Sequence, residues 1–129
     1  MGYLEDLASY IDTSTTLTAG SSLFLVSMPF ETDHCACIYE YDGVGLMENF
    51  RGGTEPLDTR LQVQVRDVDY SVARNRAKEI RDLLHAVVDT TLGSTHFYRI
   101  AAKGSITLLE VDENQRSRVK QDFSVIVTG

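Results

Sequence analysis

A change of hydrophobic period between residues 59 and 90 constrains the fold of this chain more than any other feature. The first part alternates strictly, with apolar Leu61, Val63 and Val65 between polar neighbours, which indicates a strand with one buried face. After Asp69, an expected helix N-cap, the apolar residues recur every three or four positions. They form one helical stripe, made of Tyr70, Ala73, Ala77, Ile80, Leu84 and Val87. This pattern predicts a helix lying on one face of an antiparallel or mixed sheet.

The other segments complete a single α+β domain over residues 1–129. The patterns predict a short N-terminal helix over Tyr3–Asp12 and further strands over Leu23–Met28, His34–Tyr41, Phe97–Ala102, Ser105–Val111 and Arg116–Thr128. Lys103-Gly104 is expected to turn the chain between two of these strands. The expected fold is a mostly antiparallel or mixed β-sheet with one long helix packed on one face and the short N-terminal helix beside it.

Two details of these segments bear on packing and function. The final strand alternates, so that Val119, Phe123, Val125 and Val127 share a face on which Gln121 is the one polar residue. The connection over residues 42–58 holds four glycines and a proline. A connection of that length inside a small domain is usually functional or mobile.

Charge is distributed unevenly along the chain. Residues 1–59 hold ten acidic residues and one base, a net charge of −9, whereas residues 60–129 hold nine acids and eleven bases, a net charge of +2. A solvated acidic surface explains this, and so does a field that repels a polyanion or meets a basic partner. Tight nucleic-acid binding by the acidic part is disfavoured, because such affinity depends on neutralising phosphates.

The sequence also limits where the protein acts. No apolar run approaches the roughly 20 residues that cross a bilayer, so we expect no membrane partner. The opening residues MGYLEDLASYID are acidic and interrupted, which is unlike a signal peptide. We therefore expect the protein to be made and kept in the cytoplasm.

Candidate chemistry is sparse. His34-Cys35-Ala36-Cys37 has the residue types of a metal site, but on a strand the cysteines share one face and the histidine points to the other. We interpret the cysteines as buried, reduced and metal-free. No phosphate-binding loop and no nucleophile context is present, so we predict no catalytic residue, no cofactor, no metal and no enzyme activity.

The polar face of the long helix is rich in bases. It carries Arg74, Arg76, Lys78 and Arg81, interleaved with Glu79 and Asp82. We interpret it as a solvated face, part of which can meet a partner subunit, and we expect His85 on the same side to be solvated.

Three segments carry a family resemblance. They are the strand LFLVSMP, which ends in proline; the strand, turn and helix LQVQVRDVDYSVARNRAKEIRDLLH; and the closing turn and strand DENQRSRVKQDFSVIV. Together they resemble the tail terminator and minor capsid (head-tail joining) proteins of long-tailed bacteriophages. The resemblance spans residues 1–127 and is most specific in Gln62–His85 and Asp112–Val127. The chain departs from the family in the extended VGLMENFRGGTEP segment and in Gln115, where a glycine is usual.

The resemblance implies a structural virion protein at the head-proximal end of the tail, assembled in the host cytoplasm. Such proteins form a ring, commonly of six copies, that stops polymerisation of the tail tube protein and offers a surface to the head connector. DNA passes through without specific binding. The alternatives are another phage head-tail joining protein of the same fold, or a small bacterial α+β ligand-binding or regulatory module.

The long connection is the expected assembly site. Its apolar residues Met47, Phe50 and Leu57 are expected to contact a neighbouring subunit or partner. Its acids Glu48, Glu55 and Asp58 are expected either to face the channel and repel DNA phosphates, or to decorate the outer wall and maintain solubility.

Overall fold

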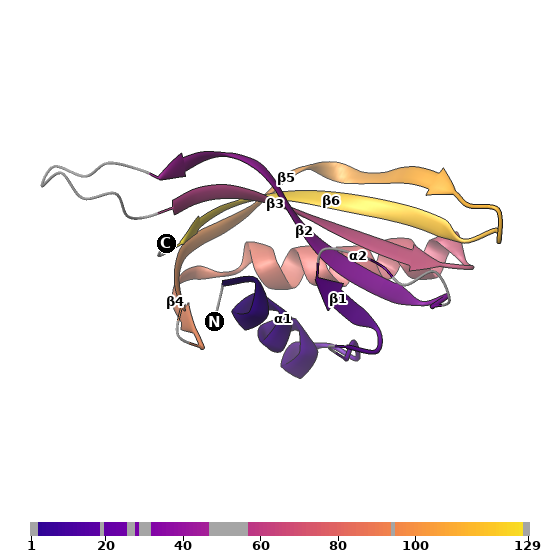
Figure 1. Cartoon of the computed structure of the whole chain (residues 1–129), viewed down its shortest axis with the longest axis horizontal. Helices are drawn as coiled ribbons and strands as arrows, with labels where there is room; N and C mark the ends of the chain where they lie inside the picture. The colour runs from indigo at the N-terminus through magenta and orange to yellow at the C-terminus, as the bar shows by residue number, and fades with distance from the viewer. Residues whose placement is uncertain are drawn as a thin grey trace, which may run out of the picture.

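The computed structural model describes residues 3–18, 20–25, 28, 32–46, 57–93 and 95–127, with the backbone alone at 41–46 and 57–58. In this part of the chain two helices accompany a six-stranded mixed sheet in one domain (Figure 1). The α+β class and the mixed sheet are therefore confirmed.

The helices are α1 (Tyr3–Ser14) and α2 (Tyr70–His85). They have 12 and 16 residues, so the expected contrast between one long and one short helix is not confirmed. Asp69 is the N-cap of α2, because its side chain accepts a hydrogen bond from the Ser71 N–H at 2.9 Å. Four residues of the predicted stripe are buried along α2, whereas Tyr70 at its start is 41% exposed.

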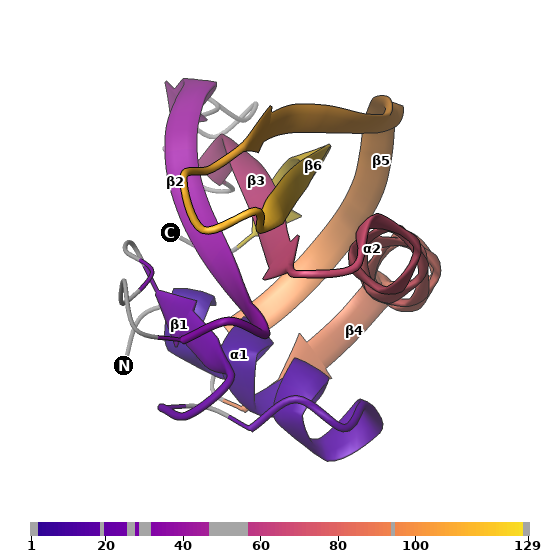
Figure 2. The same ribbon diagram turned by 90° about the vertical axis from the view of Figure 1, so that its right-hand side faces the viewer.

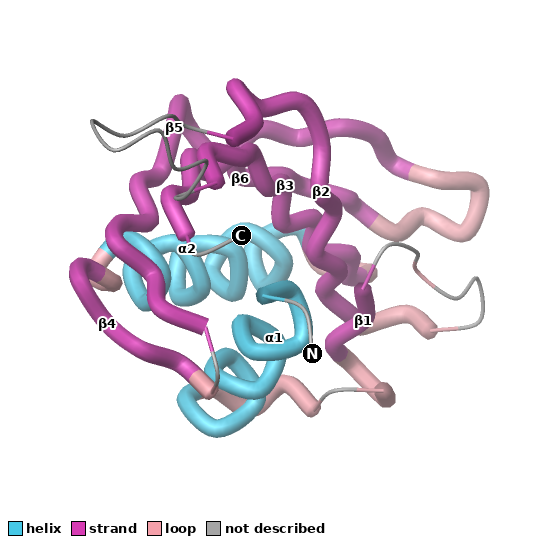
Figure 3. Tube along the Cα trace, turned by 60° about the vertical axis from the view of Figure 1, so that its left-hand side comes forward, coloured by secondary structure: helices cyan, strands magenta, loops and turns pink. Residues whose placement is uncertain are grey.

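Six strands form one sheet in the described part of the chain. They are β1 (Leu23–Leu25), β2 (Cys35–Leu46), β3 (Leu57–Asp67), β4 (Val88–Leu92), β5 (Thr95–Val111) and β6 (Ser117–Val127). Their spatial order is β1-β2-β3-β6-β5-β4, with β1 parallel to β2 and every other pair antiparallel. The sheet is curled when seen end-on (Figure 2), and both helices lie on its inner side (Figure 3).

The core lies between the inner face of the sheet and the helices. The alternating residues of β3 and β6 supply its centre, including Leu61, Val63, Phe123 and Val125. Ile80 and Leu84 of α2 and Leu7 and Ile11 of α1 close it from the other side. The two predicted alternating patterns therefore give the two central strands of one sheet.

The structure differs from the predicted strands in three places. Strand β2 continues to Leu46, and its end pairs with the start of β3 after a register shift between Tyr41 and Gly45. The backbone connection between these strands is thus shorter than the predicted 42–58, because an irregularity at glycines lets pairing resume. The unpredicted strand β4 begins shortly after α2. Its polar, partly exposed side chains have no periodic pattern that would indicate a strand.

Lys103-Gly104 is a bulge inside one 17-residue strand and not a turn between two strands. The register with β6 shifts between Lys103 and Thr107, and Gly104 takes the positive φ of +73°. The buried Gln121 side chain donates its Nε2 hydrogens to the carbonyls of Lys103 (3.0 Å) and Gly104 (3.3 Å). This polar residue of the core face satisfies backbone groups that the shifted ladder leaves out.

The outer face of the sheet is covered by a connected set of polar side chains. Gln62 donates to Asp122 (3.0 Å) and Gln64 donates to Gln62 (2.5 Å). Lys120 pairs with Asp122 at 2.7 Å, and Arg118 pairs with Glu110 and donates to Gln64 at 3.3 Å. The polar residues of the two alternating strands thus bind one another across β3 and β6.

The two cysteines lie on this outer face, yet both are free and fully buried. Burial raises the pKa of the Cys35 thiol, and the nearby Arg66 charge lowers it in part. Burial raises the pKa of Cys37 to about 11 and that of the adjacent Tyr39 to about 12. Thiols of this kind are protonated and unreactive at neutral pH.

Helix α1 is fixed to the β4–β5 turn through Asp6. This carboxylate is 8% exposed and accepts a hydrogen bond from the Thr95 hydroxyl. Gly93 in the turn has a φ of +61°, and a Cβ atom there would overlap the Asp6 carboxylate. Any larger residue at this position must displace the carboxylate.

We therefore predict that Gly93→Ala lowers the free energy of unfolding more than Gly20→Ala does. Gly20 also has a positive φ, +89°, but a Cβ atom there meets nothing within 4 Å. The control should cost about 1–2 kcal/mol from backbone strain alone, and Gly93→Ala about 2 kcal/mol more from the clash. Urea unfolding measures both, and equal losses would contradict the Asp6 contact.

For the cysteines, we predict that iodoacetamide at a mildly alkaline pH labels the native protein far more slowly than the unfolded chain. Serine at both positions should cost stability only, roughly 1–3 kcal/mol per buried hydroxyl, and leave assembly intact. Metal analysis of protein purified without added metal provides the second check. Stoichiometric zinc would overturn the interpretation.

Candidate assembly surfaces

The predicted assembly residues lie at and beyond the ends of β2 and β3. Met47, Glu48, Phe50 and Glu55 fall outside the described residues. Leu57 and Asp58 start β3, where their backbones pair with β2 on one side and with Val127 and Ile126 of β6 on the other. The predicted contact and channel roles of this set remain predictions.

One flank of the sheet is the outer side of β5. Strand β4 pairs only with the first part of β5, as far as Arg99, and no described strand pairs with the rest. Side chains of α2 occupy part of this open side instead. The Ala102 N–H donates to His85 Nδ1 at 3.0 Å, and Arg74 Nη1 donates to the Ile106 carbonyl at 3.5 Å. His85, predicted to be solvated, is exposed but also binds the backbone.

These two contacts show which side of α2 faces the open flank. Arg74, Lys78, Arg81 and His85 are spaced by four, three and four residues, so they form one stripe along the helix. Because both ends of the stripe bind the outer side of β5, its middle lies beside the same strand. Lys78 is exposed there, and Arg81 pairs with Asp82 at 3.0 Å. This flank is therefore basic.

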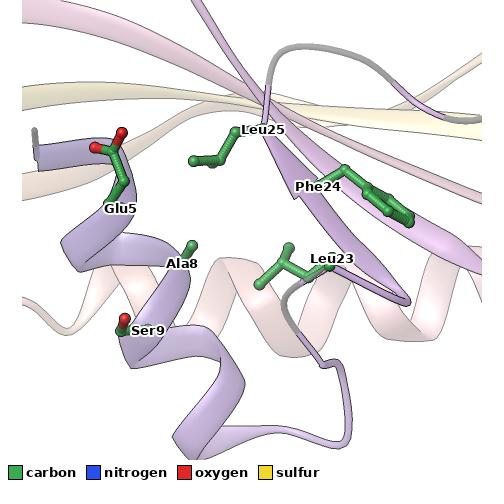
Figure 4. Close-up of a pocket in the computed structure, with 7 residues that line it drawn as sticks. Glu5, Ala8, Ser9, Leu23, Phe24 and Leu25 are labelled. Carbon is green, nitrogen blue, oxygen red and sulfur yellow. The ribbon is translucent and has the colours of Figure 1, made fainter.

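The opposite flank is formed by β1 and α1. Strand β1 is the last of the sheet, so its outer side faces no described strand. A pocket of about 360 Å³ lies between it and α1 (Figure 4). Ala8 of α1 faces Leu23 and Leu25 of β1 across this pocket, and Glu5 stands at its rim, whereas Phe24 points away from α1. The pocket is mainly apolar with an acidic rim.

Exposed apolar side chains gather at one end of the molecule. Leu108, Leu109 and Val111 end β5, and Val68 and Tyr70 join β3 to α2; all five are 41–52% exposed. The end of β5 and the start of α2 lie at the same end of the long axis in Figure 1, and this end faces the viewer in Figure 2. Such an accumulation is typical of a contact surface.

Near this end, two buried arginines fix the segment that precedes β2. Arg66 Nη2 and Arg116 Nη1 both donate to the Thr32 carbonyl, at 2.5 and 3.4 Å. Arg116, only 1% exposed, also pairs with Asp112 at 2.7 Å and with Asp33 at 3.4 Å. The Asp112 carboxylate accepts the Arg116 backbone N–H and pairs with its guanidinium, which lowers the pKa of Asp112. These contacts tie the β5–β6 turn to the start of β2.

No sequence pattern indicates this arrangement, because an arginine in an alternating strand is expected to be exposed. The neighbouring His34 binds Asp67 at 2.7 Å, away from the cysteines. Among the described residues no group of three or more His, Cys, Asp or Glu is placed to hold a metal ion. Neither described helix is long and apolar enough to cross a membrane.

Similar folds occur among solved structures, whereas no curated protein matches this chain. A chain of a solved structure titled "Virion of native gene transfer agent (GTA) particle" is similar with a TM-score of 0.66 and 14% identity, over 95% of this chain and 84% of that one. A second solved chain has a TM-score of 0.58 and 12% identity, over 98% of this chain and 91% of that one. The TM-scores show that these chains share the fold of this protein, and at identities this low the similarity shows the fold alone.

The model of a protein family matches residues 10–128, which is nearly the whole chain. The family is described as bacteriophage tail terminator protein, and the match confirms the resemblance drawn from the strand-turn-helix and closing segments. This chain belongs to the bacteriophage tail terminator family and is a structural protein of the phage virion.

Proposed function

We propose that copies of this chain form a ring, six copies being the expected number, that caps the tail tube. The ring ends polymerisation of the tube protein and forms the surface that joins the head connector. It lies at the head-proximal end of the tail and assembles in the host cytoplasm. The family match over residues 10–128 is the observation that carries this proposal.

The geometry supports a structural role of this kind. The curled sheet has two open flanks of different character, and the exposed apolar residues gather at one end. A subunit of a closed ring needs two different surfaces that meet head to tail. Contacts with tube and connector need further surfaces along the ring axis. The elongated shape, with the exposed Val68, Tyr70 and Val111 at one end, can supply them.

The direct test adds the purified protein to tail tubes made without a terminator. We expect a ring at one end of each tube and tubes of uniform length, both seen by electron microscopy. Tubes that elongate equally with and without the protein would contradict the proposal.

The long connection is proposed to belong to the assembly surface. Phe50→Asp should then reduce capping by about tenfold, because a charge cannot be buried in an apolar contact at low cost. Phe50→Leu is the matched control and should cap normally. Thermal unfolding should show that both variants fold. Normal capping by Phe50→Asp would remove Phe50 from the assembly surface while leaving the ring itself in place.

We propose further that Glu48, Glu55 and Asp58 face the channel, where negative charge repels the phosphate backbone and lets DNA slide without binding. Lysine at all three positions should leave rings assembled but slow DNA ejection from complete particles. The neutral Gln, Gln and Asn set should fall between the lysine set and the wild type. Normal ejection by the lysine particles would place these acids on the outer wall.

A further inference from the structure

The two flanks of the sheet carry charges of opposite sign, in keeping with the uneven distribution of charge along the chain. The described residues of α1, β1 and β2 contain acidic residues and no Lys or Arg. Strands β1 and β2 form one flank, and α1 packs against β1 there while its Asp6 reaches the β4–β5 turn. The α2 stripe of Arg74, Lys78 and Arg81 occupies the other flank, beside β5. The acidic flank is defined as α1 and β1 with the exposed Glu5 and Glu40. The basic flank is defined as β5 from residue 101 to 111 with Arg74 and Lys78.

These charges also lie on the same face of the sheet. Glu40 pairs with Leu61, a core residue, so its side chain projects from the inner face, the face that carries both helices. Helix α1, which contains Glu5, and helix α2, which contains Arg74 and Lys78, both lie on that same inner side of the sheet. If one sheet continues into the next, its inner face stays on one side. The acids of one copy and the bases of the next then lie on the same side of the joined sheet.

Strand direction fits the same arrangement. Successive antiparallel pairs from β2 through β3 and β6 to β5 make β5 run opposite to β2, and therefore opposite to β1. A rotation about an axis along the strands keeps the sense of every strand. The β5 strand of one copy would therefore meet β1 or β2 of the next in antiparallel pairing, the more stable type. All copies can therefore point the same way along the ring axis.

The shapes of the two flanks are also different. The acidic flank has the apolar pocket of about 360 Å³ between α1 and β1. The basic flank carries exposed Leu108 and Leu109, at a further register shift of β5 that lies between Leu108 and Glu110. A bulge of this kind pushes side chains out of the regular ladder. One flank thus offers apolar side chains and the other an apolar recess.

We propose that neighbouring copies in the ring join head to tail along the sheet, with the basic flank of one copy against the acidic flank of the next. Each flank is thus covered by another copy of this chain. Joining like flanks instead would bring like charges together, which costs free energy and selects the head-to-tail order. This inference rests on the proposed ring and specifies the contact that closes it.

Charge exchange between two variants tests the pairing. The first variant is Glu5→Lys with Glu40→Lys, and the second is Arg74→Glu with Lys78→Glu. Each alone should cap tail tubes about tenfold less efficiently, because every joint then opposes like charges. An equimolar mixture should restore capping, since each copy of one variant fits between two copies of the other. Native mass spectrometry should find both variants in each ring.

The matched control replaces two exposed acids that are not among the residues defining either flank, Glu79→Lys with Glu113→Lys. It makes the same change in net charge as the first variant and should cap like the wild type. If both flank variants cap normally, or if the mixture fails to restore capping, the head-to-tail pairing is wrong while the ring function stands. If the wild type itself does not cap, the proposed function is wrong.

A cross-link provides a second readout that does not depend on tails. Ser9→Cys places a thiol on the acidic flank and Thr107→Cys places one on the basic flank, both at exposed positions. With a short bismaleimide, each single variant should stay monomeric, their mixture should give covalent dimers, and the double variant should give a ladder of larger species. Dimers from either single variant alone would show like flanks meeting and would overturn the proposal.

Discussion

The unbroken ladder between β3 and β6 is the interaction on which the rest of the structure depends. Eleven residues pair in continuous register from Leu57↔Val127 to Asp67↔Ser117. Because this register is fixed, one side of both strands is mainly apolar, with Gln121 buried among its core residues, and the other side is a polar network. A slip of one residue would exchange these faces, so burial of Leu61, Val63 and Phe123 holds the register.

The strands outside this pair are irregular, and their irregularities shape the molecule. Strand β5 shifts register three times against β6, and β2 shifts once against β3. Bulges increase twist, which is consistent with a curled sheet. The Gln121 amide, the Ala102–His85 contact and the Arg74–Ile106 contact satisfy backbone groups that regular pairing would otherwise satisfy. Side chains of the core and of α2 thus take the place of missing strand partners.

The sequence predicts this fold well where hydrophobic periodicity determines which residues are buried. It predicts the fold poorly where contacts between segments far apart in the sequence determine the local structure. The strand around Leu61–Val65, the N-cap at Asp69 and the alternation of β6 each have a strong local signal, and all three are confirmed. Lys103-Gly104 is misleading in the sequence, because a lysine-glycine pair is as suitable for a bulge as for a turn. The difference depends on Gln121, far along the chain, and on pairing that no local pattern reveals.

The arginines at Thr32 show the same limit. Arg66 and Arg116 are 6% and 1% exposed, because a carbonyl and carboxylates from separate segments surround them.

Open strand edges carry a risk of uncontrolled association, and the flanks of this protein limit it. The outer strand β1 has only three described residues, and a short edge strand is a poor template. The open side of β5 has basic residues beside it, and part of its backbone is already bound by His85 and Arg74. A neighbour that pairs with β5 must displace these contacts, so backbone pairing alone gains little. Under the proposed joining, the net gain comes from opposite charges and from apolar side chains entering the α1–β1 recess, which only the acidic flank of another copy supplies.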